Sequence, residues 1–552
     1  MKSRNQNTIP RNTYRGAFLI ALAIMGIYLF MAACTTLWDR DEPRYARVAV
    51  EMVDSGNYLV PTFNGRKWFD KPPLLYWLMS LPIRRLGPTE FACRFFGAVG
   101  TALTCLLTFL IGQQLFGTKA GLWAMVILAS TLMVSVTGGA ATPDAVLLPF
   151  IVAAIVISAH TICSGMRLSH VLLMGAALGL GMLTKGPIGL MPIPAIATML
   201  WLDRKSGTSV LLRVRSVLAA LGIGLLIFAA WAFPANSASD GEFLRVFIGR
   251  HVINRAFRPM EHHGGNLLLY LPYYLPVIVV GFFPWTLHLL GAFSAVAGGR
   301  VGGKHGRIVL FGWIVPTFIL MTLAATKLPH YILFIWPALA LAVAGTIDAA
   351  QQDKLIERDK IWLRRGVWFF GPLAIVIALG LMAGPWFLQL PGARWPGLAS
   401  GIVLLAMTAI AIHQQRANRP QVSARILLVC MLVFGVFLFS GVLPAFEHIK
   451  ISPPIAQAIK ENTSKQTPVA TYKYGEPTLG FYVGRPIEPL RSEEAVVEWA
   501  KRPTAGVLVI PNNILDAIQE RHGTLRLDKI ASKKGFNYSK GKTLEVVALR
   551  RH

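Results

Sequence analysis

The chain has 552 residues, of which 54% are hydrophobic and only 15% are charged, a balance that excludes a soluble enzyme and indicates a polytopic membrane protein. The net charge of +27 favours anionic lipid headgroups and phosphates as partners, and we expect no nucleic-acid partner for the surfaces outside the cytoplasm. The five cysteines are scattered, so they predict neither a disulfide framework nor a thiolate metal site.

Apolar runs long enough to span a membrane recur along the chain. A helical span needs about 20 mostly apolar residues to cross about 30 Å of hydrocarbon. About thirteen segments qualify, near residues 16–37, 95–116, 120–140, 144–163, 170–184, 187–203, 216–235, 267–292, 308–326, 329–349, 367–388, 396–414 and 425–445. The first run lacks a small-residue cleavage site before Trp38, so we expect a retained span rather than a signal peptide.

The basic residues predict the orientation of these spans, because lysine and arginine accumulate in cytoplasmic loops. With a cytoplasmic N-terminus, most loop lysines and arginines fall inside, whereas the short outer loops hold little more than Lys185, Lys327 and Arg394. An odd number of spans then places the tail after residue 446 outside.

Two outer loops interrupt the pattern of spans. In the first, residues 38–94, helical periodicity over 44–54 and 72–86 predicts two short helices, too charged or too short to span, that lie in the membrane interface. The second, residues 237–266, lacks the apolar length of a span and is long enough for a functional loop or lid. We therefore expect residues 1–445 to form a membrane domain that carries both loops as catalytic elements.

The tail, residues 446–552, has the pattern of a small α/β domain outside the membrane. Segments 468–472, 505–510 and 544–549 favour strands, and segments 493–501 and 513–521 favour helices between them. The tail contains no nucleotide-binding motif, and the chain shows no convincing internal repeat.

Two aspartates at the outer ends of spans are the candidate catalytic pair. Asp41 lies in the charged sequence that follows the first span, where charge near hydrocarbon usually lines a watery site. Asp144 begins the fourth span on the same side of the membrane. The alternative for Asp144 is a structural one, because Pro143-Asp144 also suits the first turn of a helix.

Three outer lysines form a candidate phosphate pocket: Lys71, Lys185 and Lys327. Each borders an apolar run next to proline or glycine, where the backbone can turn and donors can point at a phosphate. A lone lysine of this kind more often reaches to the interface as an anchor. Three on one face, beside two aspartates, favour the pocket.

Histidines in the second outer loop are candidate metal ligands. His251 and His262, with Glu261 and His263 nearby, offer imidazole and carboxylate ligands that zinc accepts, although no compact ligand motif is present. Loop histidines that only form hydrogen bonds are the alternative, and a bound metal would fasten the loop rather than drive catalysis.

Several motifs in order resemble the polyprenyl-phosphate-dependent, C-type membrane glycosyltransferases, relatives of the protein O-mannosyltransferases. They are Asp41-Glu42, Phe69-Asp-Lys-Pro-Pro-Leu74, Thr142-Pro-Asp144, Thr184-Lys-Gly-Pro187, Arg250-His251, Tyr270-Leu-Pro272 with Gly281-Phe-Phe-Pro-Trp285, and Lys327-Leu-Pro-His-Tyr331. The resemblance covers residues 16–350 and is strongest to the bacterial aminoarabinose transferases of lipid A. The tail suits the outside-facing terminal domain of such enzymes.

The resemblance implies transfer of 4-amino-4-deoxy-L-arabinose from undecaprenyl phosphate to a lipid A phosphate at the periplasmic face of the bacterial inner membrane, which gives polymyxin resistance. It places the family's aspartates at Asp41 and Asp144. It assigns the donor phosphate and lipid to Lys71, Lys327, Tyr331, Arg255 and Arg258. Sugar or acceptor binding falls to Glu42, Arg44, Tyr45, Asp70 and Lys185.

This chemistry changes what the site must supply. A lipid A phosphate is already ionised and needs no general base, so Asp41 is expected to hold the sugar's ammonium or to stabilise positive charge at the anomeric carbon. The basic side chains bring two phosphates together. We expect no required cofactor, beyond a possible structural zinc in the outer loops, and a monomeric protein.

Three other functions compete with this one. A transferase of the mannosyl type with a protein or glycan acceptor would share the fold and the lipid-linked donor. A transporter or lipid flippase would also explain many spans, but the polar motifs gather at one face instead of the midplane. A receptor or scaffold is suggested only by the tail.

Overall fold

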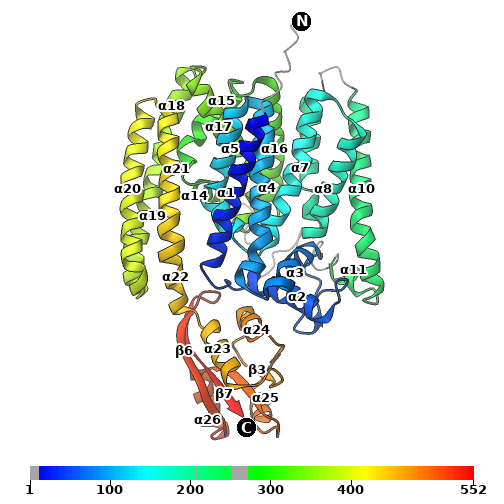
Figure 1. The fold of residues 1–552 in the computed structure, drawn as a ribbon, viewed down its shortest axis with the longest axis vertical. Helices are drawn as coiled ribbons and strands as arrows, with labels where there is room; N and C mark the ends of the chain where they lie inside the picture. The colour runs from blue at the N-terminus through cyan, green and yellow to red at the C-terminus, as the bar shows by residue number, and fades with distance from the viewer. Residues whose placement is uncertain (1–10, 205–208, 248, 250–270, 552) are drawn as a thin grey trace.

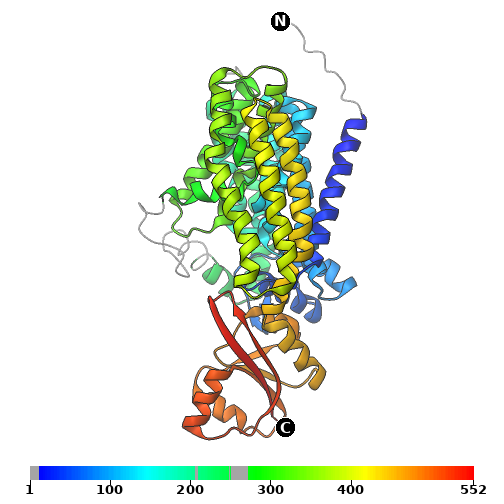
Figure 2. The same cartoon turned by 90° about the vertical axis from the view of Figure 1, so that its left-hand side faces the viewer.

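The computed structural model describes residues 11–204, 209–247, 249 and 271–551. Long helices form a bundle, and a smaller domain built from the end of the chain lies at one end of it (Figures 1 and 2). Helix α1 (Arg11–Ala33) begins at the opposite end of the bundle (Figure 1). The chain is therefore a helical membrane protein with a terminal domain on one face.

Ten helical stretches in the described part of the chain are long and apolar enough to cross a membrane. They are α1; α4 (Glu90–Phe116); α7 (Pro143–Ser164); α8 (Leu168–Lys185) with η1 (Gly186–Leu190); α10 (Val210–Ser237); α16 (Gly303–Leu323); η4 (Pro329–Ile335) with α17 (Trp336–Gln351); α18 (Glu357–Arg365) with α19 (Val367–Phe387); η5 (Pro391–Ala393) with α20 (Arg394–Arg416); and α21 (Pro420–Phe437) with η6 (Leu438–Val442), α22 (Leu443–Ala445) and η7 (Phe446–Ile449).

Three of the expected spans differ from straight membrane-crossing helices. The first is broken by 66° between α5 (Thr118–Ala129) and α6 (Leu132–Gly138), where the Thr131 hydroxyl donates to the Leu128 carbonyl. The second bends by 115° between η3 (Leu271–Tyr273) with α14 (Tyr274–Gly281) and α15 (Thr286–Ala297), at a turn that contains Pro284.

The third is the short helix α9 (Pro192–Leu202), whose 11 residues reach roughly 16 Å at about 1.5 Å per residue, well short of the hydrocarbon thickness. Of the thirteen expected spans, ten are therefore full-length helical stretches in the described part of the chain, two are bent pairs, and the one that contains α9 is too short to cross by itself.

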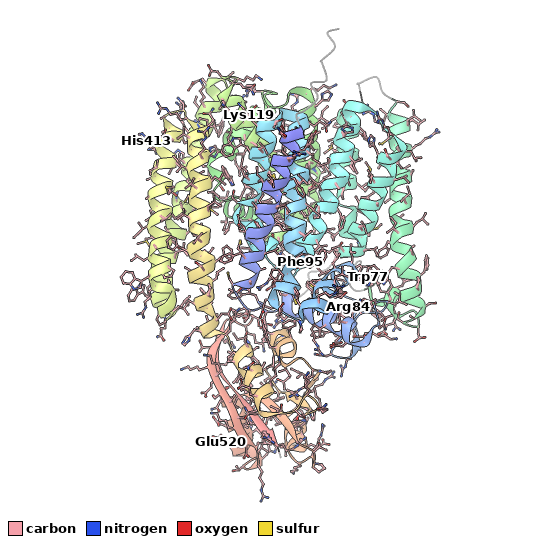
Figure 3. All side chains as sticks on the ribbon, in the orientation of Figure 1. Trp77, Arg84, Phe95, Lys119, His413 and Glu520 are labelled. Carbon is pink, nitrogen blue, oxygen red and sulfur yellow. The ribbon has the colours of Figure 1, made fainter. Side chains whose placement is uncertain are left out.

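The two short helices predicted in the first outer loop are confirmed. They are α2 (Asp41–Ser55) and α3 (Leu74–Leu86), and both lie at the end of the bundle that carries the terminal domain (Figure 1). Trp77 and Arg84 on α3 lie at this end, whereas Lys119 and His413 lie at the other (Figure 3). This separation agrees with the division of the loops into outer and inner sets.

A small hairpin in the same loop was not expected. Strands β1 (Thr62–Phe63) and β2 (Arg66–Lys67) pair antiparallel. The buried carboxylate of Glu51 on α2 accepts hydrogen bonds from the Thr62 hydroxyl and from the Asn64 and Gly65 amides, at 2.8, 2.8 and 3.2 Å. Lys67 lies 3.7 Å from a carboxylate oxygen of Glu242, in α11 (Glu242–Val246).

The terminal domain is an α/β fold, as expected. Its elements are α23 (Ser452–Asn462), β3 (Val469–Thr471), α24 (Pro477–Val483), β4 (Ile487–Pro489), α25 (Glu493–Ala500), β5 (Gly506–Pro511), α26 (Asn512–His522), β6 (Asp528–Asn537) and β7 (Lys542–Arg551). The sheet order is β4-β3-β5-β7-β6, with β3 parallel to β4 and β5, and β7 antiparallel to β5 and β6. The expectation had omitted β4, β6, α23 and α24.

Close glycine contacts bring the polar ends of three helices together. A Cβ atom at Gly100 of α4 would lie 2.2 Å from the Ala145 carbonyl oxygen of α7, and one at Gly189 would lie 2.3 Å from Gly181 of α8. Only glycine permits such approaches, which small residues supply between membrane helices. The start of α7 and the end of α8 are thereby fixed at the face with the terminal domain.

Candidate active site

Asp144 and Lys185 form the buried centre of the polar site. Asp144 lies in the first turn of α7, and Lys185 is the last residue of α8, where Gly186 turns the chain with a φ of +63°. Lys185 Nζ donates to Asp144 Oδ1 at 2.6 Å. His330 Nε2 lies 3.9 Å from the other carboxylate oxygen. Asp144 therefore does more than complement the dipole of its helix.

The sequence Asp70-Lys71 adds a second ion pair beside this centre. Lys71 Nζ lies 3.0 Å from Asp70 Oδ2, and the lysine is buried. The charge of Lys71 also acts on Asp144. The residues that were predicted separately as donor, sugar and catalytic groups are thus brought into one electrostatic cluster.

Two buried tyrosines connect Asp70 to the start of α2. The rings of Tyr45 and Tyr76 lie 6.2 Å apart. Burial raises the pKa of both phenols, and the charges of Asp70 and Asp41 raise it further. Both aspartates therefore act on the same pair of phenols, which remain neutral hydrogen-bonding groups.

Asp41 itself is accessible. It is the first residue of α2, its side chain is 55% exposed, and its carboxylate lies 3.5 Å from Arg44 Nη1. The Arg44 guanidinium also lies over the Trp68 ring, 5.7 Å from its centroid. An exposed carboxylate flanked by a cation and aromatic rings can bind an ammonium group, and this role of Asp41 stays a prediction.

The motif around Tyr331 supplies the third side of the site. Lys185 Nζ lies 5.1 Å from the centroid of the Tyr331 ring. Lys327 is buried, and its Nζ donates to the Thr322 and Ala324 carbonyls at 2.5 and 2.9 Å. In the described ranges, no carboxylate forms an ion pair with Lys327, and burial lowers its pKa. Such a lysine is suited to accept an anionic ligand.

Glu42 occupies a different environment from the predicted sugar or acceptor site. Its buried carboxylate forms a two-pronged pair with Arg94 of α4, with both N···O distances 2.7 Å. It also accepts hydrogen bonds from the Trp38 and Ala141 amides, at 2.9 and 2.7 Å. Burial raises the pKa of Glu42, but Arg94 and the hydrogen bonds outweigh this effect and hold the pKa below its usual value.

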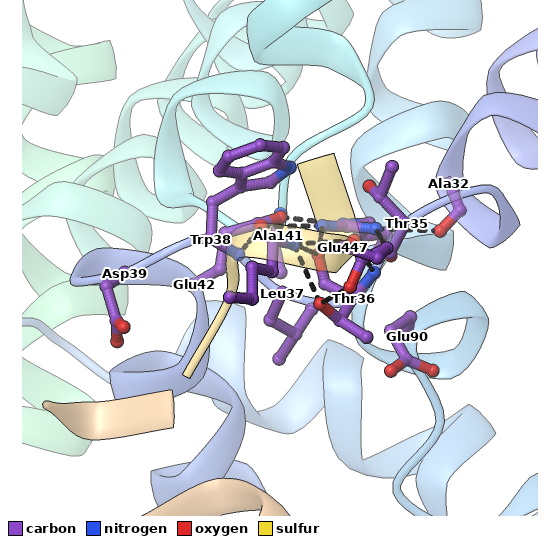
Figure 4. A network of polar contacts seen from close by, with 12 residues as sticks. Ala32, Thr35, Thr36, Leu37, Trp38, Asp39, Glu42, Glu90, Ala141 and Glu447 are labelled. Carbon is purple, nitrogen blue, oxygen red and sulfur yellow. Dashed lines mark hydrogen bonds and ion pairs between the residues drawn. The ribbon is translucent and has the colours of Figure 1, made fainter. Parts of the chain in front are cut away.

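Glu42 links α2, which carries Asp41, to α4 through Arg94 and to the loop before α7, which carries Asp144, through the Ala141 amide. Arg94 also donates to the Ala32, Thr35 and Thr36 carbonyls at 2.8, 2.7 and 3.1 Å, so the network ties the end of α1 to α2, α4 and the loop before α7 (Figure 4). Asp41 adjoins Glu42, and Asp144 follows Ala141 closely. Glu42 is therefore a structural tie rather than a ligand-binding group.

Four predicted site residues lie outside the described residues: Arg255, Arg258, His251 and His262. Donor binding by the two arginines and zinc binding by the two histidines therefore stay predictions. Within the part of the chain that the structure describes, no group of three or more histidine, cysteine, aspartate or glutamate side chains is arranged to hold a metal ion.

His330 and Trp68 were missed as site residues. His330 precedes Tyr331 in the quoted motif, and an imidazole next to a predicted site residue was a recognisable signal. Trp68 stands two residues before Asp70. The structural role of Glu42 had a signal too, because Glu42, Tyr45, Ala49 and Met52 follow helical spacing and share the buried face of α2.

Known glycosyltransferases are similar to this chain in sequence. Residues 70–233 match the family of dolichyl-phosphate-mannose-protein mannosyltransferases. The chain is 31% identical over 408 residues to the undecaprenyl phosphate-α-4-amino-4-deoxy-L-arabinose arabinosyl transferase 1 of Sodalis glossinidius (strain morsitans), an alignment that covers 70% of this chain and 69% of the relative. It is 30% identical over 339 residues to the corresponding transferase of Edwardsiella ictaluri (strain 93-146), which covers 60% of this chain and 59% of that protein.

The same fold occurs in a solved structure. The crystal structure of ArnT from Cupriavidus metallidurans bound to undecaprenyl phosphate superposes with a TM-score of 0.78 at 20% identity, over 97% of this chain and 98% of that one. The likeness extends across the membrane bundle and the terminal domain. The chain therefore belongs to the undecaprenyl phosphate-α-4-amino-4-deoxy-L-arabinose arabinosyl transferase family of membrane glycosyltransferases.

Proposed function

We propose that the protein transfers 4-amino-4-deoxy-L-arabinose from undecaprenyl phosphate to phosphate groups of lipid A. The observation that carries the proposal is the gathering of acidic and basic side chains at one end of the bundle: Asp41, Asp70, Lys71, Asp144, Lys185 and Lys327. Acidic groups suit an amino sugar, and cations suit the two phosphates on either side of it. The names of the relatives identify the sugar and the donor lipid.

The reaction conserves charge and needs little proton transfer. An oxygen of the acceptor phosphate attacks the anomeric carbon, and the bond from that carbon to the donor phosphate oxygen breaks. The acceptor becomes a phosphodiester and undecaprenyl phosphate leaves as a monoester, so negative charge passes from one phosphate to the other. The protein's task is therefore to hold two anions close together and to stabilise the cationic sugar between them.

The residues divide this task in the following way. Lys71, Lys327 and Tyr331 would bind the donor phosphate, and Lys185 would neutralise the oxygen that leaves. Asp41 and Asp70 would hold the ammonium group of the sugar. Asp144 keeps Lys185 charged and oriented and adds negative charge near the anomeric carbon. No nucleotide or catalytic metal takes part in this scheme.

The location follows from the same reasoning. The donor lipid and lipid A meet at the periplasmic face of the bacterial inner membrane, so we place the terminal domain and α2 in the periplasm and the N-terminus in the cytoplasm. The distribution of lysine and arginine in the loops supports this orientation. The site is built within one chain, which is consistent with a monomer.

Mass spectrometry of lipid A tests the proposal in cells. A deletion strain should lose the pentosamine-modified species and become sensitive to polymyxin, and the wild-type chain should restore both. Asp144→Asn should not restore them, whereas Asp516→Asn should. Asp516 is a suitable control because it lies in α26 of the terminal domain and bonds only to Asn512 in the described structure. If deletion left the pentosamine on lipid A, the proposal would be overturned. It would also be overturned if deletion removed a hexose from proteins instead.

A further inference from the structure

The segment Thr36–Arg40 joins α1 to α2 without forming a helix or strand of its own. Four consecutive backbone amides in it donate to side chains: Thr36 to Glu447 Oε1 (3.1 Å), Leu37 to the Tyr482 hydroxyl (2.8 Å), Trp38 to Glu42 Oε2 (2.9 Å) and Asp39 to the Tyr538 hydroxyl (2.9 Å). Buried amides need such partners, because an unpaired one costs about 1–3 kcal/mol. Three of these four acceptors come from the end of the chain.

The side chains of the segment are held by the same part of the molecule. The Asp39 carboxylate accepts hydrogen bonds from the amide and the hydroxyl of Thr478, at 2.8 and 2.5 Å. The Trp38 ring lies 4.0 Å from Lys450 Nζ and has its centroid 5.4 Å from that of Tyr538. Arg40 Nε lies 3.7 Å from Glu476 Oε2.

These contacts end where the candidate active site begins. Asp41 follows Arg40 directly as the first residue of α2, and Arg40 provides no side-chain cap for that helix. The direction of the first turn of α2 therefore depends on how Thr36–Arg40 is held. Figure 4 shows Trp38, Asp39 and Glu42 beside the network that connects Thr36 to Glu447.

We propose that the terminal domain is a positioning element of the active site. It clamps Thr36–Arg40 through Thr478, Tyr482 and Tyr538, and so sets the position of Asp41 and Arg44. Asp39 is a positioning residue in this clamp and touches no substrate. The inference rests on the proposed function only in that Asp41 takes part in sugar transfer.

Two conservative variants of the full-length protein test the clamp. Tyr538→Phe removes the hydroxyl that accepts the Asp39 amide but keeps the ring against Trp38, and Thr478→Val removes one donor to the Asp39 carboxylate. Matched controls are Tyr472→Phe, whose hydroxyl forms no hydrogen bond with the described residues, and Thr543→Val, on an exposed position of β7. All four are to be purified in lipid nanodiscs.

Two readouts separate positioning from general stability. Hydrogen–deuterium exchange of residues 36–45 should be about 3- to 10-fold faster in each clamp variant, the change expected from one lost hydrogen bond. Exchange in the other spans and in the sheet should match the wild type. The kcat/KM for the aminoarabinose donor should fall by a similar factor, whereas binding of undecaprenyl phosphate without the sugar should be unchanged, because the donor-phosphate residues lie on other elements. The controls should change neither quantity.

Each contrary outcome has a definite meaning. Wild-type exchange over residues 36–45 in both clamp variants would overturn the proposal, as would faster exchange spread over the whole membrane domain. A normal kcat/KM for the donor despite local loosening would show that the segment does not position Asp41. A wild-type protein that transfers no sugar would refute the proposed function instead, and the exchange measurement would still decide whether the clamp exists.

Discussion

Replacement of Glu42 offers the sharpest test of how the site is held together. Glu42→Ala removes a buried carboxylate that accepts two hydrogen bonds from Arg94 and one each from the Trp38 and Ala141 amides. Arg94 keeps three backbone carbonyls but loses its only counter-charge among the described contacts. Breaking a buried pair by removing one partner costs about 3–5 kcal/mol.

The two orphaned amides add to that loss. Each costs about 1–3 kcal/mol unless water replaces the acceptor, so the total is about 5–11 kcal/mol, comparable with the whole stability of an ordinary domain. The neighbouring variant Asp41→Asn is the control. The side chain of Asp41 is 55% exposed, and its ion pair with Arg44, at 3.5 Å, is a surface pair that contributes little. Its replacement should therefore change the free energy of unfolding by less than about 0.5 kcal/mol.

Thermal unfolding followed by size-exclusion chromatography in detergent is a suitable assay. Glu42→Ala should unfold at a much lower temperature than the wild type, and Asp41→Asn at nearly the same temperature. Only Asp41→Asn should be a well-folded protein that transfers sugar slowly. The pKa of Glu42 is held below its usual value. The stability that its carboxylate contributes is therefore complete when the pH is above the usual pKa of a glutamate, and it is lost as the pH falls through the lowered pKa. A Glu42→Ala protein with wild-type thermal stability and weakened substrate binding would refute the structural role.

Three further predictions concern separate parts of the site. Lys327→Met should leave thermal stability equal or higher, because it removes a buried charge that contacts two backbone carbonyls and the Tyr274 ring but forms no ion pair with a described carboxylate. It should nevertheless weaken binding of undecaprenyl phosphate about 10- to 100-fold in a direct binding assay; unchanged affinity would remove Lys327 from the donor site. Glu51→Gln should lower the free energy of opening of the β1–β2 hairpin by roughly 2–3 kcal/mol, because an amide cannot accept all the hydrogen bonds that the carboxylate accepts. Limited proteolysis should then cut the hairpin faster than in the wild type, and wild-type protease resistance would contradict this. Burial raises the pKa of Asp39 to about 6, with Glu476 raising it and Thr478 and Lys450 lowering it, so the stabilisation that Asp39 contributes is complete below its unfolded pKa and is lost as the pH rises through about 6. The rate of hydrogen–deuterium exchange of residues 36–45, corrected for the intrinsic rate, should therefore increase between pH 5 and 7 in the wild type but not in Asp39→Asn. The same pH dependence in both proteins would show that Asp39 is not the group responsible.

Much of the membrane architecture was predictable because hydrophobic length and loop charge act locally. The start of α7 at Pro143, the end of α8 at Lys185 and the interfacial helices α2 and α3 all follow from short-range patterns. The break between α5 and α6 was not predicted, because the apolar composition continues across it and only hydroxyls mark it. The bend at Pro284 follows a proline within an apolar run, which is typical of a kinked helix.

The roles of adjacent carboxylates depend on long-range contacts. Asp41 and Glu42 are neighbours with similar chemistry, yet one is exposed and the other is buried against Arg94. Asp39 meets Thr478, which is 439 residues away in the chain. No local pattern encodes such a contact, so the clamp could be seen only in the folded protein.

Transfer by the purified protein in nanodiscs is the most direct test of the central claim. Undecaprenyl phosphate-aminoarabinose is supplied with either lipid A or lipid A whose phosphates have been removed, and the products are identified by mass spectrometry. The account predicts a pentosamine on the phosphate of intact lipid A, none on the dephosphorylated lipid, and loss of the product in Asp144→Asn. Equal transfer to both lipids, or transfer only from a polyprenyl phosphate-linked hexose, would contradict it.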